Sequence, residues 1–144
     1  MPLTDRYGLT VSTDSSTALD RFQDGMDRLL AYAPGAEACL AEALAADPGL
    51  SVAHAGIALL ALVQGDAATA REAMARAQDT VAGATRRERQ QIEALGAFVA
   101  GESARGFALV DEHVAEFPRD AVVVNQTSSA IALAGRPDRE QHRV

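Results

Sequence analysis

Few side chains in the sequence are of the types that bind metals or act as nucleophiles. His113 and Glu116 have the i, i+3 spacing that metal ligands on a helix use, but no second His or Cys accompanies them. His54 falls near the start of a predicted helix, where we expect a half-buried packing side chain. Cys39 is the only cysteine, and its Ala and Leu neighbours predict an inert buried thiol. The sequence therefore predicts no catalytic residue, no metal site and no cofactor.

The only cationic cluster comprises Arg86, Arg87 and Arg89. Nucleic-acid binding needs a wider basic face and aromatic stacking partners, and the formal net charge of −7 opposes it. We expect instead a solvated helix start, partly paired with Glu88 and Glu93. Because cations at a helix N-terminus oppose the helix macrodipole, the cluster is also the one hint of an anionic partner.

The composition favours a single helical domain. The 144 residues are 48% hydrophobic but only 4% aromatic, so the core must consist of Leu, Val, Ile and Ala, and Ala is the strongest helix former. The sequence contains no convincing strand, and hence no Gly-rich phosphate loop between a strand and a helix. It also lacks a signal-peptide pattern and any apolar run near the ~20 residues of a membrane span. We therefore expect a cytoplasmic protein that binds neither membranes nor nucleic acid.

One turn recurs along the chain and predicts a repeat. The stretches "VQGDAATA", "VAGESARG" and "LAGRPDRE" place Gly65, Gly101 and Gly135 at intervals of 36 and 34 residues. A period of about 34 residues with two helices per unit is typical of tetratricopeptide repeats. Each of these glycines should end the first helix of a unit, because glycine tolerates the positive φ that such ends require.

Apolar periodicity predicts three helical hairpins plus one extra helix, an all-α array of the tetratricopeptide type. In the second hairpin, Ala58 and Ala70 should lie where its two helices cross, and Thr85 and Glu88 should form a capping box at the start of the third. Pro34-Gly35 replaces the Gly-Asp turn in the first hairpin, which predicts a shifted loop there. The expected helices cover 16–31, 35–49, 51–64, 67–81, 86–100, 103–117 and 119–134.

The predicted organisation is an N-terminal extension (1–15), a repeat domain (16–135) and a tail (136–144) that we expect to be truncated. The expected helix 119–134 would be the first helix of a fourth hairpin. No polar helix follows it to cover its apolar face, although helical arrays usually end with such a capping helix. An apolar face should therefore remain uncovered at this end. It predicts possible self-association through the C-terminal helix, with Val123, Val124, Ile131 and Leu133 as the candidates.

Four blocks of sequence resemble consecutive parts of the tetratricopeptide repeat protein 38 family. They are "YGLTVSTDSSTALDRFQDGMDRLLAY", "CLAEALAADPGLSVAHAG", "TRRERQQIEALGAFVAGE" and "EHVAEFPRDAVVV", in that order over about residues 5–135. The resemblance implies a longer parent protein with further helical hairpins, and it supplies no established reaction. Family members often carry a His after the Arg-Glu step of the third hairpin and a His-Asp pair in the fourth, where this chain has Gln91 and Ser128-Ser129.

We expect the chain to be a non-catalytic scaffold that binds a protein or peptide in the concave groove lined by the first helix of each hairpin. That face should include Ala55, Leu59 and Leu95. The polar candidates for partner contact are Arg87, Gln91, Asn125 and Ser129. The alternative is the N-terminal fragment of a larger helical-repeat enzyme or small-molecule-binding protein whose functional residues lie elsewhere.

Overall fold

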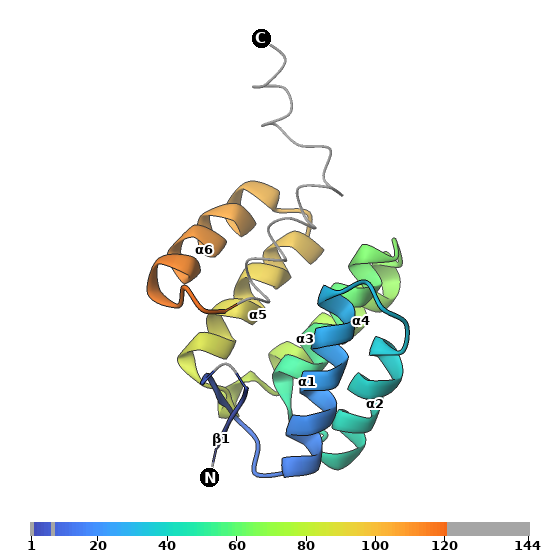
Figure 1. Ribbon diagram of the computed structural model, residues 1–144. Coiled ribbons are helices and arrows are strands. Elements are labelled where there is room, and N and C mark those ends of the chain that lie inside the picture. Colours follow the sequence, from blue (N-terminus) through green and yellow to red (C-terminus); the bar gives the residue numbers. More distant parts are fainter. Residues whose placement is uncertain (1, 7, 121–144) are drawn as a thin grey trace.

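The computed structural model describes residues 2–6 and 8–120, and this part of the chain is mostly helical (Figure 1). Six α-helices pack as consecutive antiparallel pairs: α1 with α2, α3 with α4, and α5 with α6. Their bounds are α1 Ser16–Leu30, α2 Ala36–Ala46, α3 Ser51–Val63, α4 Ala67–Asp79, α5 Arg86–Val99 and α6 Ser103–Glu116, with a short 3-10 turn, η1, at Val81–Gly83. The three predicted hairpins are therefore confirmed as pairs of antiparallel helices.

The first helix of each pair belongs to a common row. α3 contacts both α1 and α5, so α3 lies between them, and each second helix packs against the first helix of its own pair (Figure 1). Successive pairs are joined by contacts of α2 with α3 and of α4 with α5. Residues far apart in sequence on α1 and α5 thus face the same surface.

The second and third hairpins turn in the same way. Gly65 has φ 79° after α3, and Gly101 has φ 81° after α5. The Gly65 N–H donates to the Leu62 carbonyl (3.1 Å), and the Asp66 N–H donates to the Ala61 carbonyl (2.8 Å). This pair of bonds satisfies the last carbonyls of a helix and needs a left-handed residue. The two glycines therefore recur because the turn requires them.

The first hairpin has the shifted loop that its sequence predicts. Tyr32 takes the left-handed position, with φ 55°, and its N–H donates to the Leu29 carbonyl (3.1 Å). Gly35, with φ 92°, is then free to cap the start of α2. A non-glycine residue pays a steric cost in this conformation, which only local hydrogen bonding offsets.

Side-chain caps fix the starts of three helices. The predicted capping box is present: Thr85 accepts from the Glu88 N–H (3.2 Å), and Glu88 accepts from the Thr85 N–H (2.8 Å). Ser15 caps α1 and Asp66 caps α4 in the simpler way, by accepting from a backbone N–H three residues on. These caps satisfy N–H groups that have no partner within the helix.

Small residues let the helices of the first two hairpins approach closely. Ala58 and Ala70 are both fully buried, as predicted for the crossing of α3 and α4. A Cβ on Gly56 would lie 2.9 Å from the Met26 sulfur, closer than real contacts allow. Alanine and glycine thus replace aromatic residues as the means of dense packing.

A short β-hairpin at the N-terminus corrects the expectation of no strands. β1 (Leu3–Thr4) pairs antiparallel with β2 (Thr10–Val11), and Val11 is fully buried in the main core. Two-residue strands carry too little alternation to be recognised in sequence. This hairpin lies beside the start of α5 (Figure 1) and becomes part of the site described below.

The predicted fourth helix, the tail and the predicted surface for self-association fall within or mostly within 121–144, outside the described residues. None of the helices that the structure describes is long and apolar enough to cross a membrane.

Candidate functional site

Two of the four predicted contact residues lie together on α5. Arg87 and Gln91 are one helical turn apart and are 9% and 3% exposed. Asn125 and Ser129 lie outside the described residues. Arg87 and Gln91 line one cavity on the row formed by α1, α3 and α5.

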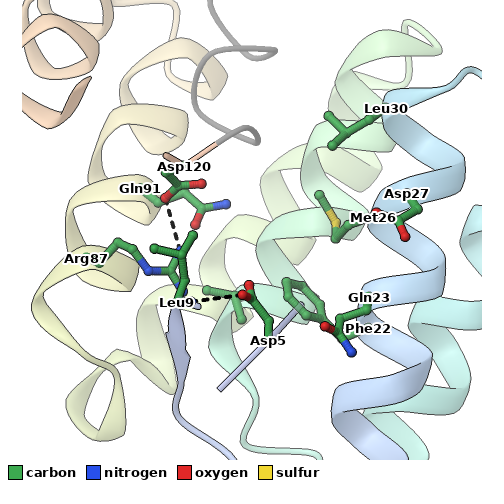
Figure 2. Close-up of a pocket in the computed structure, with 11 residues that line it drawn as sticks. Asp5, Leu9, Phe22, Gln23, Met26, Asp27, Leu30, Arg87, Gln91 and Asp120 are labelled. Atoms are coloured by element: carbon green, nitrogen blue, oxygen red, sulfur yellow. Dashed lines mark hydrogen bonds and ion pairs between the residues drawn. The ribbon is translucent and has the colours of Figure 1, made fainter. Parts of the chain in front are cut away.

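The cavity lies between α1 and α5, with α3 behind it and the N-terminal hairpin at its edge. Figure 2 shows Arg87, Gln91 and Asp120 on one side, facing Met26 and Leu30 of α1. It is lined by five apolar residues, Leu9, Phe22, Met26, Leu30 and Val52, and by six polar or charged ones, Asp5, Gln23, Asp27, Arg87, Gln91 and Asp120. The site thus combines an apolar floor with converging polar groups, which is typical of binding sites.

The cavity is small. Its volume is about 40 Å³, and a water molecule needs roughly 10–15 Å³ on this measure, so about three waters would fill it. Sites for drug-sized ligands span roughly 300–1,000 Å³. In this arrangement the cavity holds one small group and is too small for a nucleotide or a comparable cofactor.

The prediction that Arg87 is solvated is wrong. Its guanidinium donates to the Asp120 carboxylate (3.0 Å) and to the Thr10 carbonyl (2.9 Å). The segment after α6 supplies Asp120 and the N-terminal hairpin supplies Thr10, and together they cover the start of α5. Arg87 therefore connects α5 to the N-terminal hairpin and to the segment after α6.

His113 completes this buried network from α6. It is fully buried, and its Nε2 lies 2.9 Å from the same Asp120 oxygen that Arg87 binds. Its Nδ1 lies 3.0 Å from the Gln90 side-chain oxygen. The Gln90 amide is oriented by its own donation to Glu116 (2.9 Å), which leaves the oxygen for His113. Both ring nitrogens thus lie within hydrogen-bond distance of a side-chain oxygen.

Asp120 is the shared acceptor of the network. Burial is the largest single influence and raises the pKa of Asp120, but the hydrogen bond from His113 and the charge and hydrogen bond of Arg87 together outweigh it. The pKa therefore lies below the ordinary 3.8, and the carboxylate is ionised at neutral pH. A buried anion is stable here because two donors surround it.

The other charged groups near the start of α5 only partly match the prediction. Arg86 and Arg89 are exposed as expected, but Arg86 binds Glu116 (2.7 Å) and Arg89 binds the Ala82 carbonyl (2.8 Å). Glu88 is fully buried in the capping box, and Glu93 pairs with Arg105 on α6 (3.0 Å). The predicted pairing of the arginines with Glu88 and Glu93 is therefore wrong. The Arg86 pair lowers the pKa of Glu116.

The predicted burial of Cys39 and His54 is confirmed. Cys39 is buried, and His54 is half-buried with its Nε2 3.0 Å from the Pro48 carbonyl. Across residues 2–6 and 8–120, no group of three or more His, Cys, Asp or Glu side chains is placed to hold a metal ion.

Sequence reasoning missed Asp120, His113 and Gln90 as members of one cluster. The sequence singled out His113 only because of its spacing to Glu116. In the structure the two side chains are connected through Gln90, which bonds to both. One signal was available: Arg87 and Gln91 continue the buried stripe of Leu95 at four-residue spacing. Polar residues on the apolar stripe of a helix indicate a buried polar site.

A search of family models, of curated protein sequences and of solved structures found no significant match to this chain.

Proposed function

We propose that the chain is a tetratricopeptide-type scaffold that binds a segment of another protein along the row of α1, α3 and α5. The repeat identity is supported by the antiparallel pairs, by the 36-residue interval between Gly65 and Gly101 and by the identical hydrogen bonds of their turns. The resemblance of four sequence blocks to the tetratricopeptide repeat protein 38 family supports the same reading.

The observation that carries the proposal is the cavity between α1 and α5. It lies on the face that such arrays offer to extended or helical peptides, and its apolar floor is formed by buried residues such as Phe22, Met26 and Val52. Its size suits a single side chain of a larger partner. A peptide partner can use such a cavity as an anchor while the rest of its surface contacts the neighbouring helices.

An enzymatic role is the weaker candidate. The His113–Asp120 pair has the composition of an acid–base dyad, but His113 is fully buried and both ring nitrogens are occupied. A general base must come within hydrogen-bond reach of a substrate proton. The pair instead connects α5, α6 and the following segment, so we assign it a structural role.

The proposal can be tested with peptides selected from a random display library against the full chain. Leu30 and Leu44 form a matched pair, because both are partly buried leucines packed against the main core, and only Leu30 lines the cavity. Leu30→Asp should weaken the selected peptides by about tenfold or more in fluorescence anisotropy, and Leu44→Asp should not. Equal affinities for both variants, or a selection that yields no binder, would refute a peptide site on this face.

A further inference from the structure

Gln91 is a mostly buried side chain whose amide has no hydrogen bond to the described part of the chain. It is 3% exposed, yet none of residues 2–6 and 8–120 forms a hydrogen bond with its amide. Buried polar side chains in folded proteins have partners in the large majority of cases, because an unmade bond carries a desolvation penalty. Among the described residues, the only fully enclosed side-chain polar atom without a partner is the Ser51 hydroxyl oxygen, so the Gln91 amide keeps contact with solvent.

The neighbouring glutamine shows what a satisfied amide looks like in the same helix. Gln90 donates to Glu116 (2.9 Å) and accepts at its oxygen from His113 (3.0 Å). Gln90 and Gln91 differ by one position on α5 and therefore point in different directions, Gln90 toward α6 and Gln91 toward α1. The missing bonds are thus specific to the side of α5 that faces the cavity.

The Gln91 amide is directed into the cavity. Figure 2 shows it beside Asp120 on the α5 side, reaching into the space in front of α1. It presents two N–H donors and one oxygen acceptor to whatever enters. A group that fills the cavity and satisfies Gln91 must itself offer both an acceptor and a donor.

The charges at the cavity favour a neutral group. Arg87 and Asp120 are bound to each other, and Asp120 is also bound by His113. The other two carboxylates in the lining also have partners: Asp27 binds Arg6 (2.7 Å), and Asp5 accepts from the Leu9 N–H (2.9 Å). An anionic or cationic ligand would have to compete with one of these bonds in a buried environment, which is costly. A neutral amide requires no such exchange.

A peptide unit with a branched aliphatic side chain meets these requirements. Its carbonyl and N–H match the donor and acceptor of Gln91, and its side chain has about the bulk of the few waters that the cavity can hold. Leu9, Met26 and Leu30 supply the apolar walls. The chemistry therefore specifies the main chain of a partner and one of its aliphatic side chains.

We propose that Gln91 recognises the main-chain amide of a bound peptide whose aliphatic side chain occupies the cavity between α1 and α5. This inference rests on the proposed function, since it identifies how that site recognises its partner. Arg87 and Asp120 hold the wall of the cavity in place and do not bind the ligand.

The test uses the full chain and three small probes, followed through the side-chain amide signals in NMR spectra of the isotope-labelled protein. The probes are N-acetyl-leucine N-methylamide, methyl 4-methylpentanoate, which has a carbonyl but no N–H, and 3-methylbutanol, which has a hydroxyl in place of the peptide unit. The amide probe should shift the Gln91 signal with a Kd on the order of 1 mM. The ester and the alcohol should bind about tenfold more weakly or not at all.

Two variants complete the design. Gln91→Met keeps the length of the side chain and removes the amide, so it should reduce affinity for the amide probe by about tenfold without lowering the melting temperature. Gln78→Met, at an exposed position on α4, is the matched control and should change neither. If Gln91→Met failed to fold, the comparison of amide and ester on the unmodified chain would still decide the matter.

The possible failures are distinguishable. Equal binding of the three probes, or unchanged affinity in Gln91→Met, would show that Gln91 recognises nothing and is satisfied by water. If library peptides bind at Leu30 while the Gln91 signal stays fixed, the scaffold proposal stands and this inference falls. If the amide probe binds but no peptide can be selected, the site exists and the scaffold proposal falls.

Discussion

Apolar packing holds the first two hairpins together, whereas the third hairpin depends largely on a buried polar network. One continuous apolar cluster runs through α1, α2, α3 and α4 and reaches Ile92 and Leu95 of α5. Between α5 and α6 the apolar cluster is small, consisting of Ala94, Phe98 and Val110 with a few partly buried neighbours. A network of Arg87, Gln90, His113 and Asp120 occupies the remaining contact.

The difference shows how an array can build a site at one place and leave the rest as scaffold. Contacts made of alanine and leucine carry no polar group that could bind a ligand, and their packing does not require each side chain to meet one particular partner. A buried polar network requires every donor and acceptor to be matched, so it fixes one arrangement of the wall behind the cavity. The polar hairpin therefore positions the cavity, and the apolar hairpins supply its floor.

Removing the shared acceptor should have the largest effect on stability. Asp120→Ala leaves the buried Arg87 and His113 without their common partner, and we expect a loss of about 3–5 kcal/mol in the free energy of unfolding. Glu93→Ala, which breaks an exposed pair with Arg105, should cost no more than about 1 kcal/mol. Urea denaturation of both variants measures this, and similar losses would mean that the third hairpin does not depend on its polar network.

Overpacking the apolar region should have an intermediate effect. Ala70 is fully buried where α3 and α4 cross, so Ala70→Leu should cost roughly 1–3 kcal/mol. Ala68 is exposed two residues earlier on α4, and Ala68→Leu should be near neutral. Thermal melts monitored by circular dichroism compare the two, and equal melting temperatures would contradict the close approach of these helices.

Acid should loosen the third hairpin before the first two. The pKa of Asp120 is lowered in the folded chain, so its contribution to stability is fully present above the unfolded pKa of about 3.9 and is lost as the pH falls through the folded value. We expect this effect to be smaller than that of Asp120→Ala, because the protonated carboxyl keeps its place and some of its bonds. Hydrogen exchange below about pH 4 should quicken first in α6.

Asp120→Asn is the control for the acid experiment. The amide cannot ionise, so the variant should lose the part of the pH dependence that belongs to Asp120. An unchanged acid profile in this variant would assign the loosening to another group, of which Glu116 is the nearest, because its pKa is also lowered.

Local signals were sufficient for the helices and their turns. Gly65 and Gly101 mark turns that require positive φ, Thr85 and Glu88 form a cap within one turn, and the apolar periods give helices close to their observed bounds. Each of these features depends on residues at most a few positions apart. These features could therefore be predicted from the sequence without knowledge of the tertiary structure.

The faces of the helices were less well determined. Ile57, Leu60 and Val63 recur at helical spacing along α3, but these residues are only partly buried, and Val52 and Leu59 lie in the core. A helix that is apolar nearly all round gives no single stripe, so its neighbours decide which side is buried.

The sequence by itself determined that this chain forms helical hairpins with glycine turns, since propensity, capping and periodicity act over short distances. Only the tertiary structure decided the chemistry of α5. Arg87 is buried because Thr10 and Asp120, 77 and 33 residues away, are brought to it, and the Gln91 amide has no partner among the described residues because it faces a cavity walled by α1. Burial and electrostatic pairing depend on which residues distant in sequence come into contact, and local sequence patterns do not predict those contacts.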